Sequence, residues 1–265
     1  MKRRVVITGL GVVAPNGIGI EEFWESIENG VSGIDKITSF NSEGFPTTIA
    51  GEVKKFDPLN FMEPSVSLRT DRFAQFGIAA AKMALEDSKL DLNEVNKERV
   101  GVCIGSGLGG IPFHEMQIMI MYEKGLDRVH PLAVPKITPN AVSSYISIVF
   151  GLKGPNIVVS TACSSGGHAI GLAMDMIRLK RADVVCAGGV EAPLTLYTFG
   201  CYCALRVMSK RNVSPMEASR PFDKERDGFV MGEGGGILML EELNHAKKRK
   251  AKIYAEVLGY GSTGG

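Results

Sequence analysis

The sequence lacks long apolar segments and has almost no net charge. No stretch approaches the roughly 18 consecutive apolar residues that a membrane-spanning helix needs, so we predict no membrane segment. Lysine and arginine number 30 against 29 aspartates and glutamates, which gives a formal net charge of +1. This balance provides no global attraction to nucleic acid or to an anionic membrane, so an acidic partner would have to be recognised by a local basic patch.

Cysteines are few, and their number is odd. The five lie at positions 103, 163, 186, 201 and 203, without the paired spacing of a zinc site, so we predict a reducing, cytoplasmic compartment and neither a metal nor another cofactor. A basic head, Met1–Arg4, precedes an apolar segment and so resembles a secretion signal. Thr8, Gly9 and Gly11 interrupt that segment and no cleavage site follows, so residues 5–8 are better interpreted as a buried first strand.

The remaining chain alternates between strand-like and helix-like segments. With 265 residues, of which 45% are hydrophobic and 22% charged, it is long enough for one large core or two small ones. The predicted strands are continuously apolar rather than alternating, which is typical of an α/β protein with a mainly parallel mixed sheet between helical layers. They cover residues 5–8, 100–104, 157–161, 184–187, 236–240 and 253–258.

Helices are predicted over residues 21–28, 71–88, 141–150, 164–179 and 243–250. Residues 40–67 carry Pro46, Pro58 and Pro64 without a regular apolar pattern, so we expect an irregular excursion over the surface.

Two glycine-rich segments match the letters of a dinucleotide-binding fingerprint. One begins at Gly9 and the other at Gly105. Prolines follow both segments, at Pro15 and Pro112, where the fingerprint requires a helix to begin, so an oxidoreductase is a distant alternative. A third glycine cluster, residues 232–236, lacks the lysine of a phosphate loop and is predicted to border a pocket.

Cys163 has the position of a catalytic nucleophile. It follows a strand-like run and directly precedes a predicted helix, whose unpaired N–H groups and dipole favour a thiolate. Most free cysteines are buried and structural, so position alone leaves both interpretations open.

Four motifs in order resemble the elongating β-ketoacyl-[acyl carrier protein] synthases of type II, specifically the amino-terminal portion of synthase II. They cover residues 4–11, 105–110, 159–166 and 226–234, and the resemblance extends along the whole chain. It implies a thiolase-like fold and a decarboxylating Claisen condensation of acyl and malonyl thioesters in fatty acid or polyketide synthesis. By this likeness Cys163 is the acyl-accepting nucleophile, while Leu108 and Phe229 line the acyl pocket.

The resemblance also implies partners. Arg69, Arg128 and Arg206 lie where relatives bind the acidic acyl carrier protein. Members are homodimers in which the strand before the cysteine pairs across the two-fold axis, and residues 134–138 reach into the partner's pocket.

Relatives are longer and have a second, similar half that supplies two histidines, a lysine and a further oxyanion donor. Residues 1–250 correspond to the first, nucleophile-bearing half and residues 251–265 to the start of the second. His168 lies five positions after Cys163, a helical spacing that turns it away from the nucleophile, so it is expected to be structural. We therefore expect the chain to be a fragment, one subunit of a split enzyme completed by a carboxy-terminal half, or a non-condensing remnant.

Two further functions stay open. A chain-length-factor-like partner would bind acyl chains or carrier protein without catalysis, although such partners usually lack the cysteine. A thiolase-type acyltransferase would act on coenzyme A esters, although the run at residues 226–234 favours the carrier-protein enzymes.

Overall fold

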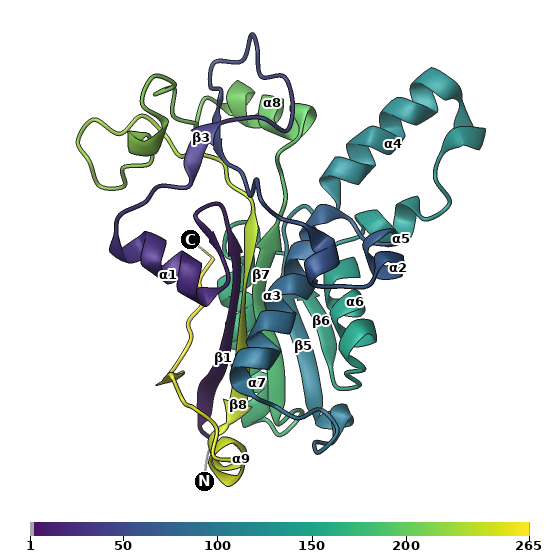
Figure 1. The fold of residues 1–265 in the computed structure, drawn as a ribbon, viewed down its shortest axis with the longest axis vertical. Coiled ribbons are helices and arrows are strands. Elements are labelled where there is room, and N and C mark those ends of the chain that lie inside the picture. Colours follow the sequence, from purple (N-terminus) through teal and green to yellow (C-terminus); the bar gives the residue numbers. More distant parts are fainter. Residues whose placement is uncertain (1–2, 265) are drawn as a thin grey trace.

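The computed structural model describes residues 3–264, so Met1, Lys2 and Gly265 lie outside it, and its centre is a seven-stranded mixed sheet (Figure 1). Strands β5, β6 and β7 are mutually parallel, and β8 runs antiparallel to both β7 and β1, so four of the five long central strands share one direction. This agrees with the predicted α/β architecture. In order across the sheet the strands are β2 (Gly17–Ile18), β1 (Val5–Ala14), β8 (Gly234–Glu242), β7 (Val184–Glu191), β5 (Val100–Gly105) and β6 (Asn156–Val159), with β9 (Ala255–Glu256) also paired to β1.

Helices cover both faces of the sheet. Helix α3 (Arg72–Ser88) packs with α6 (Ala141–Phe150) on one face, and α7 (Ser165–Arg178) packs on the other (Figure 1). Successive residues of a strand point to opposite faces, so Val102 joins the core under α3 while Cys103 joins the core under α7. Burial on both faces explains why these strands are apolar without alternation.

Strand β1 is longer than predicted, because Gly9 and Gly11 continue it rather than ending it. A Cβ atom at Gly11 would overlap the carbonyl oxygen of Ala80, and one at Gly9 would overlap that of Ala84. These glycines therefore let α3 approach the sheet backbone closely, which no larger residue would permit.

Four helices were not predicted: the short α2 (Pro64–Ser67) and α5 (Ala133–Ile137), and the longer α4 and α8. Pro112 does not break the chain but occupies the first turn of α4 (Ile111–Lys124), where a missing N–H group removes no helical hydrogen bond. Helix α8 (Leu196–Leu205) contains aromatic residues, cysteines and a glycine without a clear apolar stripe, so it gave no periodic signal.

The predicted irregular excursion at residues 40–67 is wrong in part. It contains β4 (Ile49–Gly51), which pairs with β3 (Ile34–Lys36), followed by η1 (Pro58–Asn60) and α2 (Pro64–Ser67). Ile49 is fully buried in this segment, so the excursion contributes to the core.

Shorter elements complete the chain. The predicted strand at residues 253–258 is reduced to β9, and within residues 3–264 no helix is long and apolar enough to cross a membrane. The remaining elements are α1 (Ile20–Glu28), η2 (Lys97–Arg99), η3 (Leu126–Arg128), α5 (Ala133–Ile137), η4 (Pro215–Glu217) and α9 (Leu243–Lys248).

A buried charge cluster ties α9 to the sheet. The fully buried Glu241 carboxylate accepts hydrogen bonds from Arg249 at 2.7 and 2.8 Å and from Thr8 at 2.8 Å, and it pairs with His245 at 2.6 Å. Burial alone would raise the pKa of Glu241, but these hydrogen bonds outweigh it and lower the pKa to about 2. The carboxylate thus stays ionised in the folded protein.

Candidate active site

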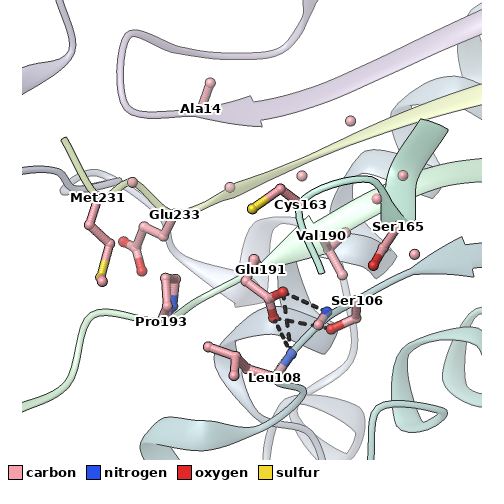
Figure 2. Close-up of a pocket in the computed structure, with 18 of the residues that line it drawn as sticks. Ala14, Ser106, Leu108, Cys163, Ser165, Val190, Glu191, Pro193, Met231 and Glu233 are labelled. Atoms are coloured by element: carbon pink, nitrogen blue, oxygen red, sulfur yellow. Dashed lines mark hydrogen bonds between the residues drawn. The ribbon is translucent and has the colours of Figure 1, made fainter. Parts of the chain in front are cut away.

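Three parallel strands end at the same edge of the sheet, and a pocket of about 990 Å³ lies there. The chain continues from the end of β6 to Cys163 and from the end of β5 to the loop at residues 106–110. The third strand, β7, ends in Glu191 itself (Figure 2). Side chains and backbone from all three segments line the pocket. Open α/β sheets bind ligands at this carboxyl edge, because loops from neighbouring strands converge there.

Cys163 lies on a strained turn. The preceding residue, Ala162, has a φ of +51°, a left-handed conformation that costs a residue with a Cβ atom about 1–2 kcal/mol. Ser165 stabilises the turn with its buried hydroxyl, which accepts a hydrogen bond from the Thr161 N–H at 2.9 Å and donates one to the Ala162 carbonyl at 2.6 Å. The turn thereby presents an exposed Cys163 side chain to the pocket.

Close backbone packing fixes the start of α7 against the sheet. A Cβ atom at Gly105 would overlap the backbone of Ser165, and one at Gly189 would lie 2.9 Å from the Cα atom of Gly166. Helix α7 begins at Ser165, two residues after Cys163, so the thiol stands at the positive end of the helix dipole as predicted. Among the described residues, none accepts a hydrogen bond from the Cys163 N–H.

Leu108 and Phe229, the residues expected to line an acyl pocket, both border the pocket that contains Cys163. Leu108 is 39% exposed and Phe229 is 43% exposed, so neither is ordinary core. The glycine cluster at residues 232–236 borders the same pocket, as predicted.

Two carboxylates that sequence reasoning missed border the pocket, and both are held by hydrogen bonds. Glu233 forms a bidentate ion pair with Arg72 at 2.6 and 2.9 Å and accepts the Val53 N–H at 2.9 Å. Glu191 accepts the N–H groups of the loop after β5 (Figure 2). The sequence signal available for Glu191 was an acidic residue at the end of a buried strand. Glu233 pairs with Arg72, which lies 161 positions away, so this pairing produced no recognisable pattern in the sequence.

The same loop argues against dinucleotide binding on new grounds. Helix α4 does begin directly after Gly110, so the objection based on Pro112 was wrong. The N–H groups of Gly107 and Leu108, which would have to bind a phosphate, instead donate to the Glu191 carboxylate at 2.6 and 3.2 Å. The phosphate position is therefore already taken by an anion.

The three arginines predicted to bind a carrier protein do not border the pocket. All three are exposed, and they belong to separate segments: Arg69 follows α2, Arg128 ends η3 and Arg206 follows α8. His168 is also outside the pocket lining, and its Nδ1 atom lies 2.8 Å from the Thr161 hydroxyl, in keeping with the structural role expected for it.

Comparisons with known proteins agree with this geometry. Residues 2–246 match the family described as beta-ketoacyl synthase, N-terminal domain. The 3-oxoacyl-[acyl-carrier-protein] synthases 2 of Coxiella burnetii and Vibrio cholerae are each 47% identical over 99% of this chain. The chain spans only 64% of their length.

Solved structures give the same result. The ishigamide ketosynthase/chain length factor aligns with a TM-score of 0.90 and 32% identity, covering 98% of this chain and 64% of that one. The complex AntDE:AntF, a type II PKS acyl-carrier protein with its ketosynthase bound to the hexaketide, aligns with a TM-score of 0.85 and 35% identity over 97% of this chain and 62% of that one. With the motifs, the fold and the position of Cys163, these matches show that the chain belongs to the β-ketoacyl synthase family, to its N-terminal domain, and that it has the thiolase-like ketosynthase fold.

Proposed function

We propose that the chain accepts an acyl group on Cys163 from an acyl carrier protein, as the first half-reaction of a 3-oxoacyl-[acyl carrier protein] synthase. The observation that carries the proposal is the exposed thiol on a strained turn, at the amino end of α7 and inside a pocket. Acylation forms a bond between the Cys163 sulfur and the thioester carbonyl carbon. The bond from that carbon to the pantetheine sulfur breaks, and the pantetheine thiol leaves with the proton that Cys163 gave up.

The residues around Cys163 support that step. An N–H group at residue 163 without a partner among the described residues is suited to stabilise the oxyanion that forms on the carbonyl oxygen. The pocket wall near Leu108 and Phe229 offers apolar surface for the acyl chain.

The second half-reaction needs groups beyond this pocket lining. Decarboxylation of a malonyl thioester releases carbon dioxide and leaves a carbanion, which attacks the acyl-cysteine carbonyl and releases the Cys163 thiolate. Among the described residues that line the pocket, the carboxylates Glu191 and Glu233 are both engaged and no histidine is present. We therefore propose that condensation requires groups supplied by the second half of the family's fold, which begins after residue 250, and not by the lining of this pocket.

The proposed partners follow from the same likeness. The exposed Arg69, Arg128 and Arg206 offer positive charge to an acidic carrier protein. A homodimer is supported by β6, which ends the strand order and exposes Ile157 by 41%. In that dimer residues 134–138, most of which belong to α5, would approach the partner's pocket. Five free cysteines fit a cytoplasmic location.

Acyl transfer from an acyl carrier protein, measured as release of the carrier's free thiol, tests the proposal. Cys163→Ser should abolish transfer, whereas Cys201→Ser, which removes another exposed thiol, should leave it unchanged. Equal transfer by the Cys163→Ser variant would refute the nucleophile. Binding of acyl carrier protein without any transfer by the unsubstituted chain would instead favour a non-condensing, chain-length-factor-like partner.

A further inference from the structure

Glu191 is a carboxylate at the pocket that the acylation chemistry does not use. Within residues 3–264 no lysine, arginine or histidine forms an ion pair with it. Burial raises the pKa of Glu191 above its ordinary value, and hydrogen bonds from the loop after β5 offset only part of that rise. Glu191 is half-buried, and a partly desolvated carboxylate without a cation is costly, so the groups that bind it must compensate for that cost.

Those groups all belong to one loop, residues 106–109. Glu191 accepts the Ser106 hydroxyl at 3.1 Å, the Gly107 N–H at 2.6 Å and the Leu108 N–H at 3.2 and 3.3 Å (Figure 2). Ser106 in turn accepts the Gly109 N–H at 3.3 Å. One side chain at the end of β7 thus organises the whole turn after β5.

The opposite side of the loop is fixed by backbone. Gly109 has a φ of +66°, and a Cβ atom there would lie 2.7 Å from the Ile137 carbonyl oxygen. The Gly110 N–H donates to that same oxygen at 3.0 Å. The loop is therefore held by the backbone of α5 on one side and by Glu191 on the other, and only Glu191 holds it through a side chain.

The hydrogen bonds from the loop to Glu191 fix the backbone position of Leu108. Its N–H group is bound to Glu191, while its side chain borders the pocket and is 39% exposed, so neighbouring side chains do not enclose it. Its position relative to Cys163 therefore depends mainly on its backbone, and the backbone depends on the carboxylate.

We propose that Glu191 is a positioning residue that holds Leu108 as a wall of the acyl pocket and thereby sets which acyl chain lengths reach Cys163. The inference rests on the proposed acyl transfer to Cys163. It adds a selectivity-determining residue that acts through the backbone of Leu108.

The test compares acylation by hexanoyl and tetradecanoyl thioesters of the acyl carrier protein. Glu191→Gln keeps the shape, but its amide nitrogen faces N–H donors, so at least one loop hydrogen bond is lost. We expect the ratio of kcat/KM values for the two thioesters to change about fivefold, since a bond to a charged group is among the stronger ones. Leu108→Ala should change the ratio as well.

The decisive variant combines the two substitutions. If Glu191 acts through Leu108, Glu191→Gln should leave the ratio unchanged in the Leu108→Ala background, because coupled residues are not additive. An unchanged ratio in the single variant, or an equal shift in both backgrounds, would overturn the inference. If Glu191→Gln fails to fold, Ser106→Ala tests the inference instead, since it removes one loop donor and keeps the carboxylate. A smaller change in the ratio of kcat/KM values would then support the inference, and no change would overturn it. Failure of the unsubstituted chain to acylate would instead refute the proposed function itself.

Discussion

Ser165→Ala tests how the turn that carries Cys163 is held in place. The Ser165 side chain makes two buried hydrogen bonds, one from the Thr161 N–H at 2.9 Å and one to the Ala162 carbonyl at 2.6 Å. Each is worth about 1 kcal/mol, and the Thr161 N–H would be left without its acceptor, so the loss is about 2–3 kcal/mol. Part of it should appear as relaxation of Ala162 from its φ of +51°.

Thermal unfolding followed by circular dichroism measures the first effect, and acylation by an acyl carrier protein measures the second. We expect the Tm to fall by roughly 5–10 °C and acylation to slow by about tenfold, since 1.4 kcal/mol of lost preorganisation corresponds to a factor of ten. Ser164→Ala is the matched control, because its neighbouring hydroxyl is exposed and makes no capping hydrogen bond. Equal Tm values and equal acylation rates for the two variants would refute the reasoning.

Three further predictions address the frame around the site. Glu241→Gln should lower the free energy of unfolding by about 3 kcal/mol at pH 7. Because the folded pKa of Glu241, about 2, lies below its ordinary 4.5, this difference should be present above pH 4.5 and disappear as the pH falls toward 2. A difference that does not depend on pH in urea titrations would contradict the pairing. Gly105→Ala should cost about 2–3 kcal/mol in the same titrations by displacing α7, and a neutral effect would contradict the close packing. Ile157→Lys on the exposed edge strand should convert a dimer to monomers in sedimentation experiments, whereas a persistent dimer would place the interface elsewhere.

The sheet was predictable because its strands are buried on both faces and are therefore apolar without interruption. The position of Cys163 between β6 and α7 was predictable because a strand, a short turn and an amphipathic helix follow one another in the sequence. The length of β1 was not predictable, since glycines such as Gly9 and Gly11 ordinarily weaken a strand. Here they lie within β1 because α3 packs closely against them. Helix α8 escaped detection because it lacks a periodic apolar stripe.

The site beyond Cys163 depended on contacts between distant parts of the chain. Glu191 meets Gly107 across 84 positions, and Arg72 meets Glu233 across 161, so neither pairing leaves a local pattern. The glycines of the loop after β5 gave a nucleotide-like signal, and only the structure shows that a carboxylate already occupies their N–H groups. Sequence thus predicted the position of Cys163 before α7 but not the side chains that position its surroundings.

Location of the acyl group by peptide mapping tests the central claim most directly. The chain would be incubated with a hexadecanoyl thioester of the acyl carrier protein, digested and analysed by mass spectrometry. The predicted result is one acyl group on the peptide that contains Cys163, with Cys201 unmodified although it too is exposed. An unmodified Cys163, or equal acylation of the two cysteines, would contradict the account.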